Sequence, residues 1–214
     1  MPKMLVSTIG FDEKFTIRAI IRYLDELESF VGILATPVDE RVLQAVNNIK
    51  SFIDRYMKDA NKLLSYSFIE IDVSDPYSAI SRIKRLFSPE REYILNLSGG
   101  MRALVITTLI AFVISRASGI IEIELENFKE RIVIDPKVLV AGPLSGDEKK
   151  IVNIISRLGK ATYKEIMKET NIPRATLFKI LSSLISKEII RRERVDRTSY
   201  YMLTDIGRAY ADTS

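Results

Sequence analysis

The chain has 214 residues, enough for one or two domains that each bury a core of their own. It contains neither cysteine nor histidine, which excludes disulfides, thiol nucleophiles, imidazole bases and the usual zinc ligands. Its net charge of +4 is uneven, because residues 1–143 hold 18 basic and 19 acidic side chains whereas residues 144–214 hold 14 and 9. A basic small domain behind a nearly neutral larger one predicts that the second part binds a polyanion, with a solvated basic surface as the alternative.

Two segments bear on membrane contact. The first ten residues lack a basic region followed by a long apolar core and a cleavage site, which a secretion signal requires. The most apolar helical segment, residues 103–115, is shorter than the ~18 to 20 residues needed to span a bilayer. We therefore expect a cytoplasmic protein that makes no contact with a membrane.

Residues 1–139 repeat a short apolar run followed by a segment of helical period. The runs predict strands at residues 4–9, 30–35, 66–73 and 92–97. The periodic segments predict helices at residues 14–29, 39–62, 76–87 and 101–115. Residues 119–127 and 130–136 complete the domain as a hairpin. Because parallel strands need crossover connections, this alternation predicts an α/β domain with a Rossmann-like parallel sheet covered on both faces.

A stretch with Gly, Pro and Ser, residues 140–147, is expected to be the linker to a second domain at residues 148–214. Helices are predicted there at residues 147–159, 163–170, 174–188 and 204–211, and a hairpin at residues 189–203. Thr162 followed by Glu165 has the spacing of a capping box at the start of the second helix. This order of elements is that of a winged helix-turn-helix domain.

The third helix of that domain is expected to enter the major groove of double-stranded DNA, and the hairpin to grip phosphates or enter the minor groove. The candidate DNA-binding residues are Arg174, Thr176, Lys179, Arg191, Arg192, Arg194 and Arg197. A winged helix used for dimerisation or for protein contacts is the alternative, since the fold alone does not fix the function.

Unusual sequences follow two of the predicted strands, STIGF at residues 7–11 and NLSGGMR at residues 96–102. Ligands of open parallel sheets bind at the carboxyl ends of strands, near the point where strand order reverses. The paired glycines allow close backbone approach, a helix amino terminus offers unpaired N–H groups, and Arg102 adds a donor suited to phosphate. The sequence therefore predicts an anion site, although neither a dinucleotide fingerprint nor a P-loop is present. Alternatively, Ser98 caps a buried helix, the glycines form a tight turn and Arg102 lies on the surface.

These two motifs make the front domain resemble the CRISPR-associated Rossmann-fold sensor domains called CARF. The whole chain resembles the CRISPR-associated CARF and winged-helix transcription regulators of the Csa family. The resemblance implies a homodimer that binds a cyclic oligoadenylate across its dyad, with cyclic tetra-adenylate as the expected ring. The family's motifs fall on Thr8, Gly10, Phe11, Asn96, Ser98, Gly99, Gly100 and Arg102, and Ser7 joins them as a candidate at the end of the first strand. Phe11 is a candidate for stacking on adenine.

The segment at residues 103–115 is apolar on all sides, so a helix there must be covered on both sides. We expect one side to face the sheet and the other to lie near a partner subunit. A plain monomer core is the alternative.

The expected function is a ligand-responsive, DNA-binding transcription regulator without catalytic residues, metal or cofactor. One alternative is a metal-independent ring nuclease, in which Ser7, Thr8 or Ser98 would act with Arg102 on a ribose hydroxyl held in line for attack. Another is a DNA-binding protein whose front domain only dimerises.

Overall fold

The computed structural model describes residues 3–60 and 64–212 of the chain. It divides into two units, Met1–Pro136 and Lys137–Ser214, called here the front unit and the rear unit. The division precedes the expected linker at residues 140–147: Pro136–Leu139 form a 3-10 turn, η1, and the first long helix of the rear unit begins at Gly146.

The described part of the front unit holds a six-stranded sheet with the order β3-β2-β1-β4-β5-β6. Its strands are β1 (Lys3–Thr8), β2 (Leu27–Thr36), β3 (Ser65–Asp72), β4 (Glu92–Asn96), β5 (Ser118–Glu124) and β6 (Arg131–Ile134). The first five strands are parallel, and β6 pairs with β5 in the antiparallel sense as the expected hairpin. Strand order runs outward in opposite directions from β1 and β4, which places the switch point between these two strands.

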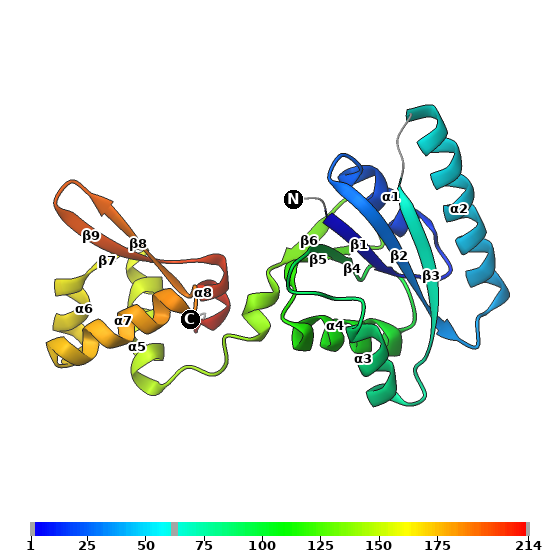
Figure 1. Ribbon diagram of the computed structural model, residues 1–214. Helices are drawn as coiled ribbons and strands as arrows, with labels where there is room; N and C mark the ends of the chain where they lie inside the picture. Colours follow the sequence, from blue (N-terminus) through cyan, green and yellow to red (C-terminus); the bar gives the residue numbers. More distant parts are fainter. Residues whose placement is uncertain (1–2, 61–63, 213–214) are drawn as a thin grey trace. The chain divides into compact units, whose positions relative to one another are not determined.

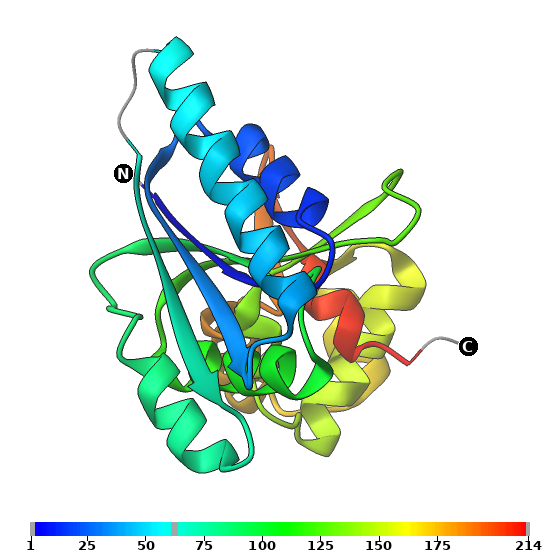
Figure 2. The ribbon, with the colours of Figure 1, turned by 90° about the vertical axis from the view of Figure 1, so that its right-hand side faces the viewer.

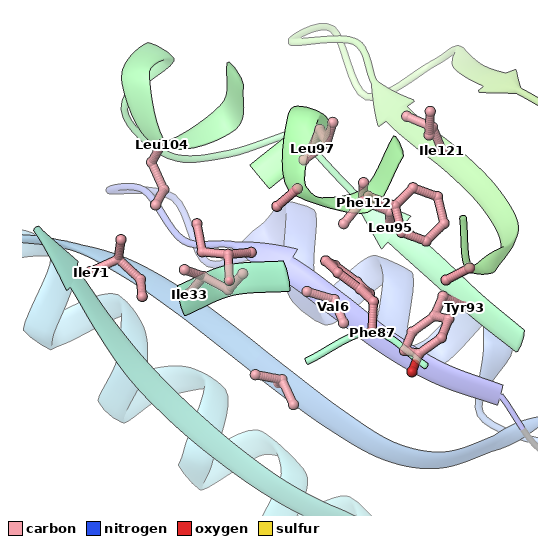
Figure 3. Packing of buried hydrophobic residues seen from close by; sticks show 14 of the residues in the cluster. Val6, Ile33, Ile71, Phe87, Tyr93, Leu95, Leu97, Leu104, Phe112 and Ile121 are labelled. Atoms are coloured by element: carbon pink, nitrogen blue, oxygen red, sulfur yellow. The ribbon is translucent and has the colours of Figure 1, made fainter. Parts of the chain in front are cut away.

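Helices cover both faces of this sheet, as Figures 1 and 2 show. The helices are α1 (Lys14–Tyr23), α2 (Glu40–Ala60), α3 (Pro76–Lys84) and α4 (Arg102–Ser115). Side chains that alternate along each strand feed two separate cores: Leu5 packs in the cluster under α1 and α2, whereas Val6 packs in the cluster under α3 and α4. The second cluster includes Tyr93 and Phe112, whose rings lie edge to face (Figure 3).

Two predicted helices of the front unit extend beyond the helices of the structure. The helix expected at residues 14–29 ends at Tyr23, because Leu27 already pairs with Lys3 at the start of β2. The helical spacing of apolar residues continues beyond Tyr23, but the backbone from Leu27 onward forms β2 of the sheet. The helix expected to run to residue 87 ends at Lys84, after which the chain continues in tight turns. The helix expected at residues 39–62 corresponds to α2. Its expected end, residue 62, lies outside the described residues.

The rear unit has the order of elements of a winged helix-turn-helix domain. Its elements are α5 (Gly146–Leu158), β7 (Ala161–Thr162), α6 (Tyr163–Thr170), α7 (Arg174–Ser186), β8 (Ile190–Val195), β9 (Thr198–Leu203) and α8 (Asp205–Tyr210). The predicted capping box at Thr162 and Glu165 is confirmed, and Ser145 and Glu148 form a second one. The short strand β7, which was not predicted, pairs with β9 in a three-stranded sheet of the order β7-β9-β8. The α/β, Rossmann-like front and the winged-helix rear are thus as predicted.

Candidate ligand crevice and nucleic-acid interface

The loops that follow β1 and β4 lie side by side at the switch point of the front sheet, because Ser7 on β1 pairs with Asn96 on β4. They also touch each other: a Cβ added to Gly10 would lie 2.6 Å from the backbone nitrogen of Gly100. Gly100 has a φ of +97°, which side chains rarely tolerate. These glycines therefore let one loop pack directly on the other. We call the edge formed by the two loops the crevice.

Ser7 and Thr8 lie beneath this edge and are fully buried. The Ser7 hydroxyl lies 3.0 Å from the Thr16 hydroxyl of α1. The Thr8 hydroxyl donates to the Gly99 carbonyl of the other loop at 2.5 Å. The Thr8 hydroxyl therefore joins the two loops, and the Ser7 hydroxyl holds β1 to α1 beneath them.

Asn96 is also fully buried and organises the second loop. Its side-chain amide donates to the Phe15 carbonyl at 3.3 Å, and its oxygen accepts from the Ser98 N–H at 2.9 Å. The Ser98 hydroxyl accepts from the Glu124 N–H of β5 at 2.8 Å. Ser98 therefore ties the loop to the sheet, and the alternative in which it caps the following helix is wrong.

Phe11, Arg102 and the amino terminus of α4 form the exposed part of the crevice. Phe11 is 56% exposed and Arg102 is exposed. The residue that precedes α4 is Met101, whose side chain makes no capping hydrogen bond. The first N–H groups of a helix have no partner within it, so these groups keep their capacity for an anion.

Arg41, at the start of α2, is a neighbour of the crevice that the sequence analysis missed. The central carbon of its guanidinium lies 4.0 Å from the centroid of the Phe11 ring, a distance typical of a cation–π contact. Asp39 accepts from Arg41 Nε at 3.3 Å. The strand order could have predicted the place of Arg41. Because β2 lies beside β1, the loop after β2 reaches the same edge of the sheet as the loop after β1.

A charged cluster that the sequence analysis did not foresee lies next to the crevice, between α1 and the β5–β6 hairpin. Glu122 and Glu124 of β5 are almost completely buried. The donors to their carboxylates are Arg18, Arg22, Tyr23 and Arg131. Burial, followed by the hydrogen bond to Glu122, raises the pKa of Tyr23 to about 12. We call this group the arginine–glutamate cluster.

One face of α4 is buried against the sheet and the opposite face is exposed and apolar. Leu104, Ala111 and Phe112 belong to the core. The exposed side chains are Ile106, Ile110 and Ile114, which recur every four residues on one side of the helix. The expectation that one side of this helix covers the sheet is confirmed. The contact of its other side with a partner subunit stays a prediction.

In the rear unit, α7 and the β8–β9 hairpin border an open groove of about 1080 Å³. Its lining residues are Thr162, Tyr163, Lys164, Arg174, Ala175, Phe178, Lys179, Arg192, Arg197, Thr198, Ser199 and Tyr201. Four of the predicted DNA contacts are thus brought together. The other three, Thr176, Arg191 and Arg194, are exposed but do not line the groove.

The helical period explains which residues of α7 line the groove. Leu177, Leu181 and Leu184 point into the core of the rear unit, so the side that carries Arg174 and Lys179 points outward. On the hairpin, the Arg192 guanidinium donates to the Ser199 hydroxyl across the strand pair, at 3.0 Å from Nε and 2.8 Å from Nη2. That contact holds the side chain of Arg192 in place beside the groove.

Within residues 3–60 and 64–212, no group of three or more His, Cys, Asp or Glu side chains could hold a metal ion. In the same part of the chain, no helix combines the length and the apolar character that crossing a membrane requires.

The comparison with protein families decides the relationship of the front unit. A model described as the Csa3 CRISPR-associated Rossmann-like domain matches residues 3–135, more than half of the chain. The chain belongs to this family. A second model, described as the sugar-specific transcriptional regulator TrmB, matches residues 144–206. This member of the Csa3 family therefore joins a CRISPR-associated Rossmann-like domain to a winged-helix regulator domain, the architecture of a DNA-binding regulator.

Individual relatives are distant. The uncharacterized protein MJ1254 of Methanocaldococcus jannaschii is 29% identical over 82 residues, and this match spans 38% of the chain but only 18% of the relative. The solved structure of VC1899 from Vibrio cholerae aligns with a TM-score of 0.41 and 14% identity, over 97% of this chain and 64% of that one. Can2 from Sulfobacillus thermosulfidooxidans, solved in complex with cyclic tetra-adenylate, aligns with a TM-score of 0.39 and 10% identity, over 97% and 61%.

Proposed function

We propose that this protein is a DNA-binding regulator of a CRISPR system whose front unit senses a cyclic oligoadenylate at the crevice. The observation that carries the proposal is the placement of an exposed aromatic ring, an exposed arginine and an uncapped helix start at the switch point of the sheet. A ligand with several phosphates and adenines needs anion donors and stacking surfaces together. The crevice offers both within a domain of a CRISPR-associated family.

The crevice residues divide into two roles in this proposal. Arg102 and the N–H groups at the start of α4 bind phosphate, and the Phe11 ring stacks on adenine. The buried residues hold the two loops in position without touching the ligand; they are Ser7, Thr8 and Asn96. Gly10, Gly99 and Gly100 keep the two loops packed on each other. Ser98 anchors the second loop to β5.

The exposed isoleucines of α4 supply the surface for the homodimer in this proposal. Ile106, Ile110 and Ile114 form an apolar stripe on the same helix whose amino terminus borders the crevice. A two-fold contact along this helix would bring two crevices together, which suits a symmetric cyclic ligand.

In this proposal the basic groove of the rear unit binds DNA, and α7 enters the major groove of the duplex. A dimer would address two half-sites about one helical turn apart, ~34 to 36 Å. The ligand regulates DNA binding only if its affinity differs between two arrangements of the dimer.

The first test is a calorimetric titration of the full chain with cyclic tetra-adenylate, with linear tetra-adenylate as the comparison. We expect saturable binding of the cyclic ligand at one ring per two chains. Arg102→Ala should weaken it by roughly tenfold or more, since a hydrogen bond to a charged group contributes about 1.5–3 kcal/mol. Arg82→Ala is the matched control, because Arg82 is an exposed arginine on α3.

The outcomes of this titration separate the proposal from its rivals. Equal loss of binding in both arginine variants would contradict a specific role for Arg102. Heat from neither ligand would favour a front unit that only dimerises. Chromatography of the mixture after long incubation tests for the ring nuclease, which would leave linear product.

The dimer is tested separately by sedimentation. Ile110→Glu places a charge in the apolar stripe and should convert the protein to a monomer. Ile21→Glu is the matched control, because Ile21 is an exposed isoleucine on α1. A dimer that survives Ile110→Glu unchanged would exclude the exposed face of α4 as the interface.

A further inference from the structure

Phe178 is the one groove residue with an exposed ring that nothing in the fold explains. It lies on the outer side of α7 and is 64% exposed. The core side of the helix is already filled by Leu177, Leu181 and Leu184. Burying a phenylalanine stabilises a protein, so its exposure here contributes nothing to the rear unit.

Phe178 also differs from the other phenylalanines in its ring contacts. All nine phenylalanines of the chain lie in the described residues. Every other phenylalanine packs on another ring, stacked or edge to face, or carries a cation above its face, including the exposed Phe11, whose partner is Arg41. No ring or cation partner of this kind accompanies Phe178 within the described residues. Its ring is therefore available to a molecule that enters the groove.

The charge of the groove limits what that molecule can be. Arg174, Lys179, Arg192 and Arg197 line it together with Phe178. None of these four cations forms a salt bridge within the described part of the chain. An apolar ring beside cations that have no salt-bridge partner suits a ligand with apolar groups between phosphates. The major groove of DNA is such a ligand wherever it exposes the C5-methyl group of thymine.

We propose that Phe178 reads thymine by contacting its C5-methyl group, while Arg174 or Lys179 on the same face binds a guanine edge. The inference rests on the proposed DNA-binding function and adds a base preference to it. Arg174 and Phe178 are four residues apart, a rise of about 6 Å along the helix. Because base pairs rise by about 3.4 Å, we expect the preferred half-site to hold a thymine within about two steps of a guanine.

The experiment begins with selection of binding sites from random duplexes by the full chain. Affinities are then measured by fluorescence anisotropy for the selected duplex and for one in which deoxyuridine replaces thymine in the half-sites. This replacement removes only the methyl groups. The wild-type protein should lose about fourfold in affinity for each methyl that it contacts, the equivalent of one buried CH₂.

Phe178→Ala should bind the thymine and deoxyuridine duplexes equally, whereas Phe178→Leu, which keeps an apolar side chain, should retain part of the preference. Tyr77→Ala is the matched control, since Tyr77 is an exposed aromatic residue on α3 of the front unit, and it should keep the full preference. Thermal unfolding of each variant verifies that it is folded.

An undiminished thymine preference in Phe178→Ala would overturn the inference and leave the DNA-binding function intact, as would a selected site without thymine. A shift of free Phe178→Ala protein from dimer to monomer would also overturn it, because the ring would then serve a protein interface. If the wild-type chain selects no sequence and binds no duplex, the proposed DNA-binding function itself fails.

Discussion

Three arginines of the front unit surround buried carboxylates, whereas three arginines of the rear unit line an open groove. In the arginine–glutamate cluster, Arg22 bridges Glu122 and Glu124, both of which are almost inaccessible to solvent. In the groove, Arg174 and Arg197 are exposed and have no salt-bridge partner among the described residues. The same type of side chain thus serves the fold in the arginine–glutamate cluster and is available to a ligand in the groove.

The difference shows what decides the role of an arginine. A buried carboxylate without a cation is costly, so the cations of the cluster are required by the front unit itself. The groove cations form no salt bridge with any of the described residues, and they fit a partner that brings its own negative charge. Changes to the cluster should therefore affect stability, and changes to the groove should affect binding.

The largest effect is expected from Glu122→Gln. Glu122 is fully buried and accepts from Arg22, from the Tyr23 hydroxyl at 2.5 Å and from Arg131 at 3.1 Å. Removing its charge takes one buried carboxylate from Arg22, which keeps only Glu124, and weakens the pairing of Arg131, so we expect the free energy of unfolding to fall by roughly 3–5 kcal/mol. Denaturant titration followed by circular dichroism measures this change.

Glu126→Gln provides the control for this substitution, because Glu126 is an exposed glutamate just beyond the end of β5. We expect it to change the unfolding free energy by less than about 0.5 kcal/mol. A similar effect of both substitutions would mean that the cluster does not stabilise the front unit.

The next largest effect concerns the groove. Arg174→Ala should weaken binding to the selected duplex by roughly 1–3 kcal/mol if the side chain reads a base. Lys149→Ala removes the same charge from an exposed position on α5 outside the groove, and we expect a much smaller loss. Equal losses measured by anisotropy would show that only the net charge of the rear unit matters.

The fold was largely predictable because the spacing of apolar residues along the sequence indicates which side of each helix or strand is buried. The alternation of strands and helices gave the parallel sheet, and the capping box at Thr162 and Glu165 gave the start of α6. The boundary between α1 and β2 was missed, because Leu24 and Leu27 continue the helical spacing of the preceding residues. Pairing of Leu27 with Lys3 in the sheet outweighs that local pattern, and such pairing is not encoded by nearby residues.

The sites were less predictable, since their side chains come from distant segments. The arginine–glutamate cluster nevertheless left a signal: Arg18 and Arg22 are four apart on a helix, and Glu122 and Glu124 are two apart on a strand. Both spacings correspond to about 6 Å, so the pairs match when helix and strand lie side by side. Phe178 left no such signal, because an apolar residue in a helix is ordinarily read as core.

The pH dependence of the unfolding free energy is a further test of the arginine–glutamate cluster, with an expected effect of about 1 kcal/mol. Burial and the hydrogen bond to Glu122 raise the pKa of Tyr23 from 10.0 to about 12. The folded state then holds the phenol proton more tightly than the unfolded state, so this stabilisation is complete below pH 10 and is lost as the pH rises toward 12. Two pKa units correspond to about 2.7 kcal/mol, which partial exposure of Tyr23 reduces to about 1 kcal/mol.

Tyr23→Phe isolates this contribution. Between pH 10 and 12 the unfolding free energy of the wild type should fall more steeply than that of the variant, as measured by denaturant titration at each pH. Parallel curves would show that the Tyr23 hydroxyl is not coupled to the buried carboxylate.

The smallest effect on stability is expected from Arg197→Ala in the turn of the rear hairpin. Arg197 is exposed and lines the groove, so its loss should change the unfolding free energy by less than about 0.5 kcal/mol. The same substitution should lower the slope of log affinity against log salt by about 1, because one phosphate contact fewer releases one counterion fewer. Like Glu122→Gln, it removes a single charge, but from a side chain that forms no salt bridge among the described residues. If Arg197→Ala instead destabilised the rear unit and left the salt slope unchanged, the groove arginines would serve the fold as those of the front unit do, and the division between the two units would not hold.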